Sequence, residues 1–237
     1  MTRQGAMRQF ARWHIRLGWL VAVPLLLWTA SGLVMVARPI EEVRGDHLRL
    51  PVAERPLPQD TRIAISLPAE GTRPVRSVIT RVEGGETITR IAYMDGTSER
   101  FRADGSAMGP LSEIEARMIV ARGIRGGDQV TEATRFEAQD VPLDYRRPEA
   151  VWQIVLDDGT HVYVGVDTGE IEAVRTRWWR VFDVIWGLHI MDLQTREDTH
   201  HPVLVAFAAL ALVGTVLGTA LLFHRRRRTP RPDALGT

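Results

Sequence analysis

Two long stretches without a charged residue dominate the pattern of apolar and polar positions. They cover residues 17–37 (LGWLVAVPLLLWTASGLVMVA) and 202–223 (PVLVAFAALALVGTVLGTALLF), which are 21 and 22 residues long. The hydrocarbon core of a bilayer is about 30 Å thick and needs about 20 helical residues. A core helix of a soluble protein would show a polar face, and these stretches show none. The pattern therefore predicts two transmembrane helices, the first of them continuing through Pro24 because a bilayer offers the backbone no other partner.

Between these stretches the pattern changes to short alternating runs. Residues 38–60 hold four prolines and indicate an extended linker. Residues 61–108 contain the runs RIAISL, VRSVITRV, ETITRIAYM and SERFRA, separated in part by Gly84-Gly85, Asp95-Gly96 and Asp104-Gly105. Alternation interrupted by glycine turns predicts antiparallel strands.

A helix is predicted next, over residues 111–123. Ser112 and Glu115 form an S-x-x-E capping box, which satisfies free backbone N–H groups at a helix start. Gly123 fits the left-handed residue that commonly ends a helix. The apolar face expected to pack on the sheet consists of Ile114, Met118 and Ala121.

Strands are predicted again at residues 129–139 and 151–156, and the second of these opens the hairpin WQIVLDDGTHVYVGVDTGEIEAV. The Asp-Gly-Thr turn at residues 95–97 recurs 63 residues later at 158–160, and the turn that follows it recurs at the same offset. This echo predicts two hairpins of the same design. Together with the helix, the strands predict an α+β domain of antiparallel sheet plus helix.

The segment before the second apolar stretch, residues 175–193, reads RTRWWRVFDVIWGLHIMDL. Tryptophans beside charges favour a helix lying at the headgroup level of a membrane. The alternative is an ordinary helix packed on the outer domain.

Charge predicts the orientation. Residues 1–16 and the segment after residue 223 each sum to +4, so the rest carries −7 of the total +1. Short basic flanks stay in the cytoplasm, so residues 38–201 are expected outside, which in a bacterial inner membrane is the periplasm. We interpret Arg225–Arg228 as a headgroup-contacting anchor and not as a nucleic-acid patch. Cleavage of the first stretch near Thr29–Gly32, as in a signal peptide, is the alternative to a permanent span.

Composition and motifs exclude several kinds of chemistry. Cysteine is absent, so the chain has no disulfides and no thiolate ligands. The motifs H-E-x-x-H, G-x-S-x-G and G-x-G-x-x-G are also absent from the sequence. The carboxylates Asp157, Asp158 and Asp167 are better explained by turns. No catalytic residue and no metal site is therefore predicted.

Histidines near the spans are the candidate cofactor ligands. Paired imidazoles from two helices can hold the iron of a b-type haem. His14 and His224 are expected to pair at the cytoplasmic face, within a protomer or across a dimer, and His189 is expected to pair outside with His200, with His201 or with its own copy across a dimer. The alternative is that interfacial histidines need no ligand. His47 and His161 are expected on the surface of the outer domain. Gly214 and Gly218 form a G-x-x-x-G that could serve helix packing within the chain or dimerisation.

Three segments resemble a known family. The hairpin of residues 152–174, preceded by the capped helix, resembles a PepSY domain. W-H-I-R-L-G-W with T-A-S-G later in the first span, and W-G-L-H-I-M-D-L before the second, resemble the motifs of PepSY-associated transmembrane proteins. The resemblance covers nearly the whole chain. Some PepSY proteins are thought to be binding or inhibitory modules for peptidases. Larger, four-span members include siderophore-linked iron reductases that hold haem, and His14 and His189 match their motif histidines.

The resemblance implies a membrane-anchored binding or regulatory module, with a haem-binding electron-transfer subunit for iron uptake as the alternative. This chain has two spans instead of four, so a complete haem site would need a dimer. The expected partners are the lipid bilayer and a second copy or another membrane protein, and no nucleic acid. The expected parts are a basic N-terminus with the first span (1–37), a linker (38–59), the PepSY-like domain (60–174), the aromatic helix and loop (175–199), the second span (200–224) and a basic tail (225–237).

Overall fold

The computed structural model describes residues 3–51, 54–68 and 72–226, and the chain divides into two compact units. The helical unit joins both ends of the chain, Met1–Arg38 and Val181–Thr237, and the sheet unit is the continuous stretch Pro39–Arg180. From position 227 on, the expected basic tail lies outside the described residues, so the orientation inferred from it stays a prediction.

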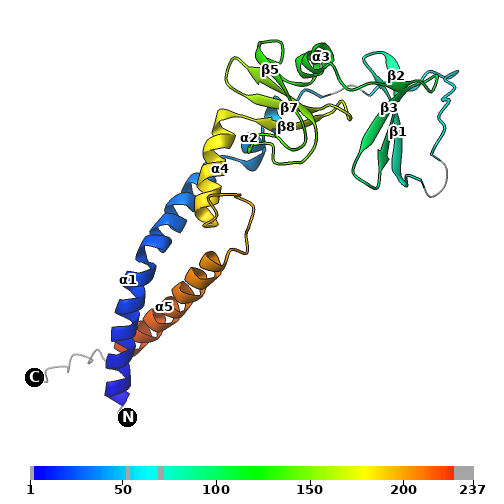
Figure 1. Ribbon diagram of the computed structural model, residues 1–237. Coiled ribbons are helices and arrows are strands. Elements are labelled where there is room, and N and C mark those ends of the chain that lie inside the picture. The colour runs from blue at the N-terminus through cyan, green and yellow to red at the C-terminus, as the bar shows by residue number, and fades with distance from the viewer. Residues whose placement is uncertain (1–2, 52–53, 69–71, 227–237) are drawn as a thin grey trace, which may run out of the picture. The chain divides into compact units, whose positions relative to one another are not determined.

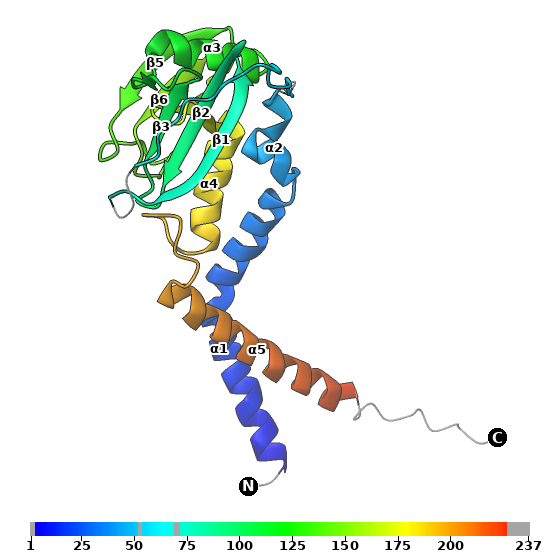
Figure 2. The ribbon, with the colours of Figure 1, turned by 90° about the vertical axis from the view of Figure 1, so that its right-hand side faces the viewer.

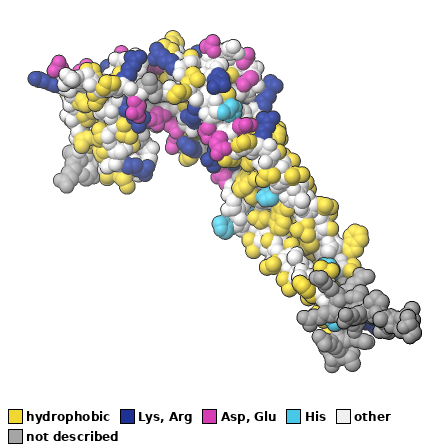
Figure 3. All heavy atoms as spheres, turned by 180° about the vertical axis from the view of Figure 1, so that it is seen from behind, with side chains coloured by type: hydrophobic (Ala, Val, Ile, Leu, Met, Phe, Trp, Pro, Cys, Tyr) yellow, Lys and Arg dark blue, Asp and Glu magenta, His cyan; other side chains and the backbone are white. Residues whose placement is uncertain are grey.

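The helical unit contains the two long apolar helices expected from the sequence. They are α1 (Arg3–Met35) and α5 (Pro202–Arg226), and they pack against each other, crossing in the view of Figure 2. By length and composition both could cross a membrane. Trp19 is 81 % exposed and Leu222 69 % exposed, and hydrophobic side chains cover much of the visible helix surface in Figure 3. α1 passes through Pro24 as expected and begins well before the apolar stretch.

The aromatic segment forms α4 (Arg177–His189), and the boundary between the two units falls inside it, after Arg180. In the helical unit, Trp28 Nε1 donates a hydrogen bond to the carbonyl of His189 at 2.8 Å. Arg196, in the loop that leads to α5, forms an ion pair with the buried Asp183 at 2.6 Å. These contacts tie the end of α4 to α1 and to its own following loop. Its expected location at the headgroup level stays a prediction.

The sheet unit contains two antiparallel sheets, where the sequence suggested one. The first has the order β1-β2-β3-β4 and the second the order β5-β6-β7-β8, so each is a meander of four consecutive strands. The strands are β1 (Val75–Glu83), β2 (Glu86–Tyr93), β3 (Ser98–Arg102), β4 (Ala107–Met108), β5 (Val130–Phe136), β6 (Val151–Leu156), β7 (His161–Gly165) and β8 (Ile171–Arg175). The run RIAISL, expected as a strand, is not one. Its Ala64 N–H donates one bond to Ala103 O at 3.0 Å.

The expected pair of equal hairpins is confirmed by the strand register. Ile88 pairs with Arg102 across β2 and β3, and 63 residues later Val151 pairs with Gly165 across β6 and β7. Both turns use an Asp-Gly-Thr sequence in which the aspartate accepts the N–H of the threonine two residues on. The glycine of each turn has positive φ, 88° at Gly96 and 76° at Gly159, which explains the Asp-Gly signal.

A short helix in the predicted linker corrects the expectation of an extended chain there. α2 (Ile40–Arg44) ends at Gly45, whose φ is 75°, and the 3₁₀ helix η1 (Asp46–Leu48) follows. A Cβ on Gly45 would lie 2.7 Å from Val174 Cγ1. The start of the sheet unit is therefore packed directly against the end of β8.

The capped helix forms as predicted, but its buried face is a different one. α3 (Glu113–Gly123) carries the reciprocal Ser112–Glu115 capping box. Ile114 is 71 % exposed, while Ala116 and Val120 are fully buried against the second sheet. Gly123 is the last helical residue and does not adopt the left-handed conformation. A Cβ there would lie 2.7 Å from Ile171 Cδ1, so close packing explains this glycine. Met118 and Ala121, the other members of the expected face, are also exposed.

The core of the sheet unit lies on both faces of the second sheet. One face packs under α3, with Ile154, Val162 and Val164 at its centre. The opposite face buries Val151, Tyr163 and Tyr145, the last from the long connection between β5 and β6. The Arg90 guanidinium of β2 forms an ion pair with Glu170 in the β7–β8 turn, which links the two sheets.

Candidate functional site

His14 lies against the middle of α5, farther into the helix pair than the expected cytoplasmic mouth. Its Nδ1 donates a hydrogen bond to Gly214 O at 2.9 Å. A Cβ on Gly218 would lie 2.7 Å from His14 Cε1 and 3.3 Å from both ring nitrogens. Gly218 precedes His224 by six residues, which is about 9 Å along a helix. Within one protomer the structure therefore does not bring His14 and His224 together, and their pairing across a dimer stays a prediction.

The G-x-x-x-G of α5 serves packing within the chain. A Cβ on Gly214 would lie 4.0 Å from Leu17 Cβ, and Gly218 accommodates the imidazole of His14. Small residues let two helix backbones approach closely in an apolar environment. The two alternatives left open by the sequence are thus decided for this protomer in favour of the α1–α5 contact.

His189 is held by the first span through a serine. Its Nδ1 lies 2.8 Å from Ser31 Oγ, and the Ser31 hydroxyl donates its own hydrogen to Leu27 O at 2.6 Å. His189 Nδ1 is therefore the donor, which leaves a lone pair on Nε2. Gly32 lies beside the ring, since a Cβ there would be 3.6 Å from His189 Cε1. The segments T-A-S-G and W-G-L-H, far apart in sequence, meet at this point.

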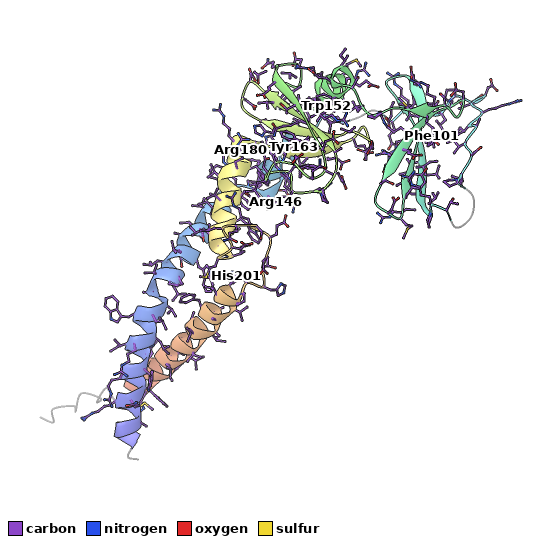
Figure 4. The ribbon with its side chains drawn as sticks, viewed as in Figure 1. Phe101, Arg146, Trp152, Tyr163, Arg180 and His201 are labelled. Atoms are coloured by element: carbon purple, nitrogen blue, oxygen red, sulfur yellow. The ribbon has the colours of Figure 1, made fainter. Side chains whose placement is uncertain are left out.

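Among the remaining candidate histidines, the described structure gives a side-chain contact to His200, whose Nδ1 lies 3.4 Å from Thr199 Oγ1. His201 Nδ1 and His224 Nε2 are buried without a hydrogen-bond partner, and Figure 4 labels His201 near the start of α5. His200 is exposed, and its backbone N–H donates to Asp198 at 2.8 Å. The hydrogen bond that the structure gives His189 Nδ1 runs to Ser31, and the expected pairing of His189 with His200 or His201 stays a prediction.

A haem fits these histidines unequally. At His14 the Nδ1 atom is already hydrogen-bonded to Gly214 O, and the Cε1 edge of the ring lies against Gly218 of α5. At His189 the hydrogen bond from Nδ1 to Ser31 orients the ring, as outer partners do for metal-bound histidines, and Nε2 keeps its lone pair. His189 can therefore offer one axial ligand, and a second would have to come from another residue or a second copy.

The sheet unit holds a polar cluster that sequence reasoning missed. Asp144, from the connection between β5 and β6, accepts hydrogen bonds from Tyr163 OH at 2.6 Å and His161 Nδ1 at 3.1 Å. Arg175 Nε donates to the Asp144 carbonyl at 2.7 Å, and the Tyr145 ring stacks on Tyr163 at 4.9 Å. His161, expected on the surface, is instead a half-buried member of this cluster. Its position opposite the α3 face of β7, two residues from Tyr163, was the signal available in the sequence.

Burial and hydrogen bonds tune the cluster in opposite directions. Burial opposes the ionised Asp144 carboxylate, but the bonds from His161 and Tyr163 outweigh it and hold its pKa below the usual value. Burial, with the nearby Asp144, raises the pKa of Tyr163 far above its usual value, so this phenol stays neutral. Tyr163 is also fully buried and cannot reach a substrate. The cluster pins the β5–β6 connection to the sheet, and its Tyr163 phenol is not accessible.

Comparison with known proteins assigns no function to these residues. The structure of the described residues contains no group of three or more His, Cys, Asp or Glu side chains that could hold a metal ion. No protein-family model matches the chain, and neither a curated protein nor a solved structure matches it.

Proposed function

We propose that this protein is a membrane-anchored binding or regulatory module whose sheet unit lies outside the cytoplasm, as the resemblance to PepSY-associated transmembrane proteins implies. The observation that carries the proposal is the packing of α1 on α5. Two apolar helices from opposite ends of the chain are joined by the His14–Gly214 hydrogen bond and expose apolar side chains elsewhere. Such a pair makes a compact anchor in lipid. A binding role also agrees with the full burial of Tyr163, which keeps this phenol away from a substrate.

Fusions to alkaline phosphatase test the anchored topology. The arginine distribution predicts activity for a fusion after residue 140, an exposed loop position, and no activity for a fusion at the C-terminus. The reverse pattern contradicts the proposed location of the sheet unit. Activity at both positions contradicts a second span that returns the chain to the cytoplasm.

A haem-binding electron-transfer subunit is the second candidate, and His189 favours it. The Ser31–His189 hydrogen bond orients the imidazole and leaves Nε2 to coordinate iron, and the partner ligand would come from a second copy or another protein. Bound haem would supply one-electron chemistry, while Ser31 and Gly32 would hold the ligand in place.

Absorbance of the purified full chain, expressed with ample haem, separates the two candidates. The binding module predicts no Soret band. A Soret band that weakens in His189→Ala, and persists in the matched His47→Ala control, supports the haem subunit and replaces the first proposal.

A further inference from the structure

Four residues at the end of the sheet unit form a cluster that neither proposed function uses. The ring of Trp179 lies 4.2 Å from Arg175 Cζ and 5.9 Å from Arg146 Cζ, so two guanidinium groups lie over one indole. Arg180 Nη1 donates to the carbonyl of Arg175 at 3.2 Å. We call Arg146, Arg175, Trp179 and Arg180 the arginine–tryptophan cluster. Figure 4 labels Arg146 and Arg180 near the start of α4.

Neutral carbonyl oxygens position two of these arginines. Arg175 Nε donates to Asp144 O at 2.7 Å, and Arg180 Nη2 donates to Gly159 O at 2.7 Å. Within the described part of the chain, no ion pair joins Arg175 or Arg180 to a carboxylate. Their orientation is therefore determined by the fold, while their charge is left for an outside partner.

The electrostatics of Arg175 point to an anion. Burial lowers the pKa of its guanidinium, and the charges of Arg146 and Arg147 lower it further. The carboxylate of Asp144 opposes this effect, but it already accepts bonds from His161 and Tyr163. An anion beside Arg175 would restore the stability of its charged form. Planar guanidinium groups bind phosphate oxygens through paired N–H donors.

The chain path indicates where that anion comes from. Arg180 is the last residue of the sheet unit, and the next residue belongs to the unit of the two apolar helices. At the other chain connection, Gly45 lies against Val174 and Thr176, so both connections leave from the same end of the sheet unit. Tryptophan beside cationic groups is enriched at the headgroup level of membranes.

We propose that the arginine–tryptophan cluster binds the phosphate of an anionic phospholipid headgroup. The proposal rests on the membrane anchoring stated above. The neighbouring α2 carries Glu41 and Glu42 as well as Arg44, so this end of the unit is not uniformly basic. We therefore expect the cluster itself to bind a single headgroup. The whole end of the unit is not expected to be attracted to a charged membrane surface.

The absence of cysteine permits a site-specific test in the full chain. Leu143 is 54 % exposed, and only its backbone carbonyl bonds Arg146, so Leu143→Cys can carry an environment-sensitive fluorophore beside the cluster. The labelled protein, in neutral detergent, is titrated with dihexanoyl-phosphatidylglycerol, dihexanoyl-phosphatidylcholine and inorganic phosphate. We expect phosphatidylglycerol to bind about tenfold more tightly than either of the others.

Matched variants show whether the arginines carry this preference. Arg146→Gln and Arg180→Gln should each reduce phosphatidylglycerol affinity about tenfold, while Arg76→Gln, an exposed arginine of β1, should leave it unchanged. Circular dichroism identifies a variant that fails to fold. The affinity of the other, folded arginine variant then tests the proposal. Equal binding of the two lipids, or unchanged affinity in the folded variants, overturns the proposal. Inorganic phosphate binding as tightly as phosphatidylglycerol overturns the lipid source and leaves a free-phosphate site.

The phosphatase fusions keep the two proposals apart. If the fusions contradict the predicted topology, the proposed function is wrong. The lipid titration of the purified chain still tests the headgroup site independently. Intact topology without lipid selectivity removes only the headgroup site.

Discussion

His189 and Ser31 lie 158 residues apart in the sequence, yet His189 Nδ1 approaches Ser31 Oγ to 2.8 Å. The hydrogen bond joins the last residue of α4 to α1, and Trp28 adds a second bond to the same residue. Polar contacts of this kind connect helices where apolar packing is not directional. This point of contact joins α4 to α1 and orients the imidazole of His189, whose Nε2 keeps its lone pair.

Ser31→Ala removes the hydrogen-bond acceptor of His189 and should destabilise the helical unit. The expected loss is about 1 kcal/mol, which lowers the unfolding midpoint of the full chain in detergent by about 2–4 °C. Ser66→Ala, at an exposed position of the sheet unit, is the control. An unchanged midpoint in Ser31→Ala would show that the bond contributes nothing to stability.

Gly218→Val should separate α1 from α5, because a Cβ there would lie 2.7 Å from His14 Cε1. Overpacking of this kind costs about 1–3 kcal/mol. A Leu17→Cys/Gly214→Cys pair reports the contact, since a Cβ on Gly214 lies 4.0 Å from Leu17 Cβ, within disulfide range.

We expect the disulfide to form readily in the otherwise unchanged chain and poorly with Gly218→Val. Adding His14→Ala should restore it, because the clashing ring is gone. Gly18→Val is the control, since a Cβ at Gly18 meets nothing within 4 Å. A disulfide that forms equally well with Gly218→Val would contradict the packing described.

Glu83→Gln should stabilise the sheet unit near neutral pH. Burial raises the pKa of Glu83 above its usual value, although Arg90 opposes this shift. A raised folded-state pKa means that stability is full below the unfolded value, near 4.5, and declines as pH rises through the folded value. Glutamine does not ionise, so the variant does not lose this stability. Near neutral pH its free energy of unfolding should be higher by up to about 1 kcal/mol after allowance for solvent screening. Unfolding midpoints from pH 4 to 8 should converge for the two proteins at the acid end, and a constant difference would exclude this explanation.

Asp144→Asn should destabilise the sheet unit with the opposite pH dependence. The pKa of Asp144 is lowered on balance, because bonds from His161 and Tyr163 outweigh burial. Its contribution is present above the unfolded value, near 3.8, and is lost as pH falls through the folded value. At pH 7 we expect a loss of about 1–2 kcal/mol, measured by denaturant unfolding. Asp140→Asn, an exposed neighbour, should have little effect, and equal effects of both changes would refute a specific role for Asp144.

Features set by neighbouring residues could be predicted from the sequence. The two long helices follow from uninterrupted apolar stretches, and the start of α3 follows from Ser112 and Glu115, which bond only each other's backbone and side chain. The Asp95 and Asp158 turns follow from a side chain that accepts the N–H two residues on. In each case the interacting groups lie within a few residues, so the order of residues is sufficient.

Features set by distant residues needed the tertiary structure. The buried face of α3 depends on which residues of the second sheet meet Ala116 and Val120, and the depth of His14 depends on the position of Gly218. Asp144 joins His161 and Tyr163 only because the β5–β6 connection folds back over β7. The sequence alone determined the two long helices, the capped helix and the two hairpins, because turns and apolar runs act locally, but it missed α2 and predicted a strand at RIAISL that does not form. The tertiary structure decided which faces are buried and which polar groups meet, because those contacts join residues that are far apart along the chain.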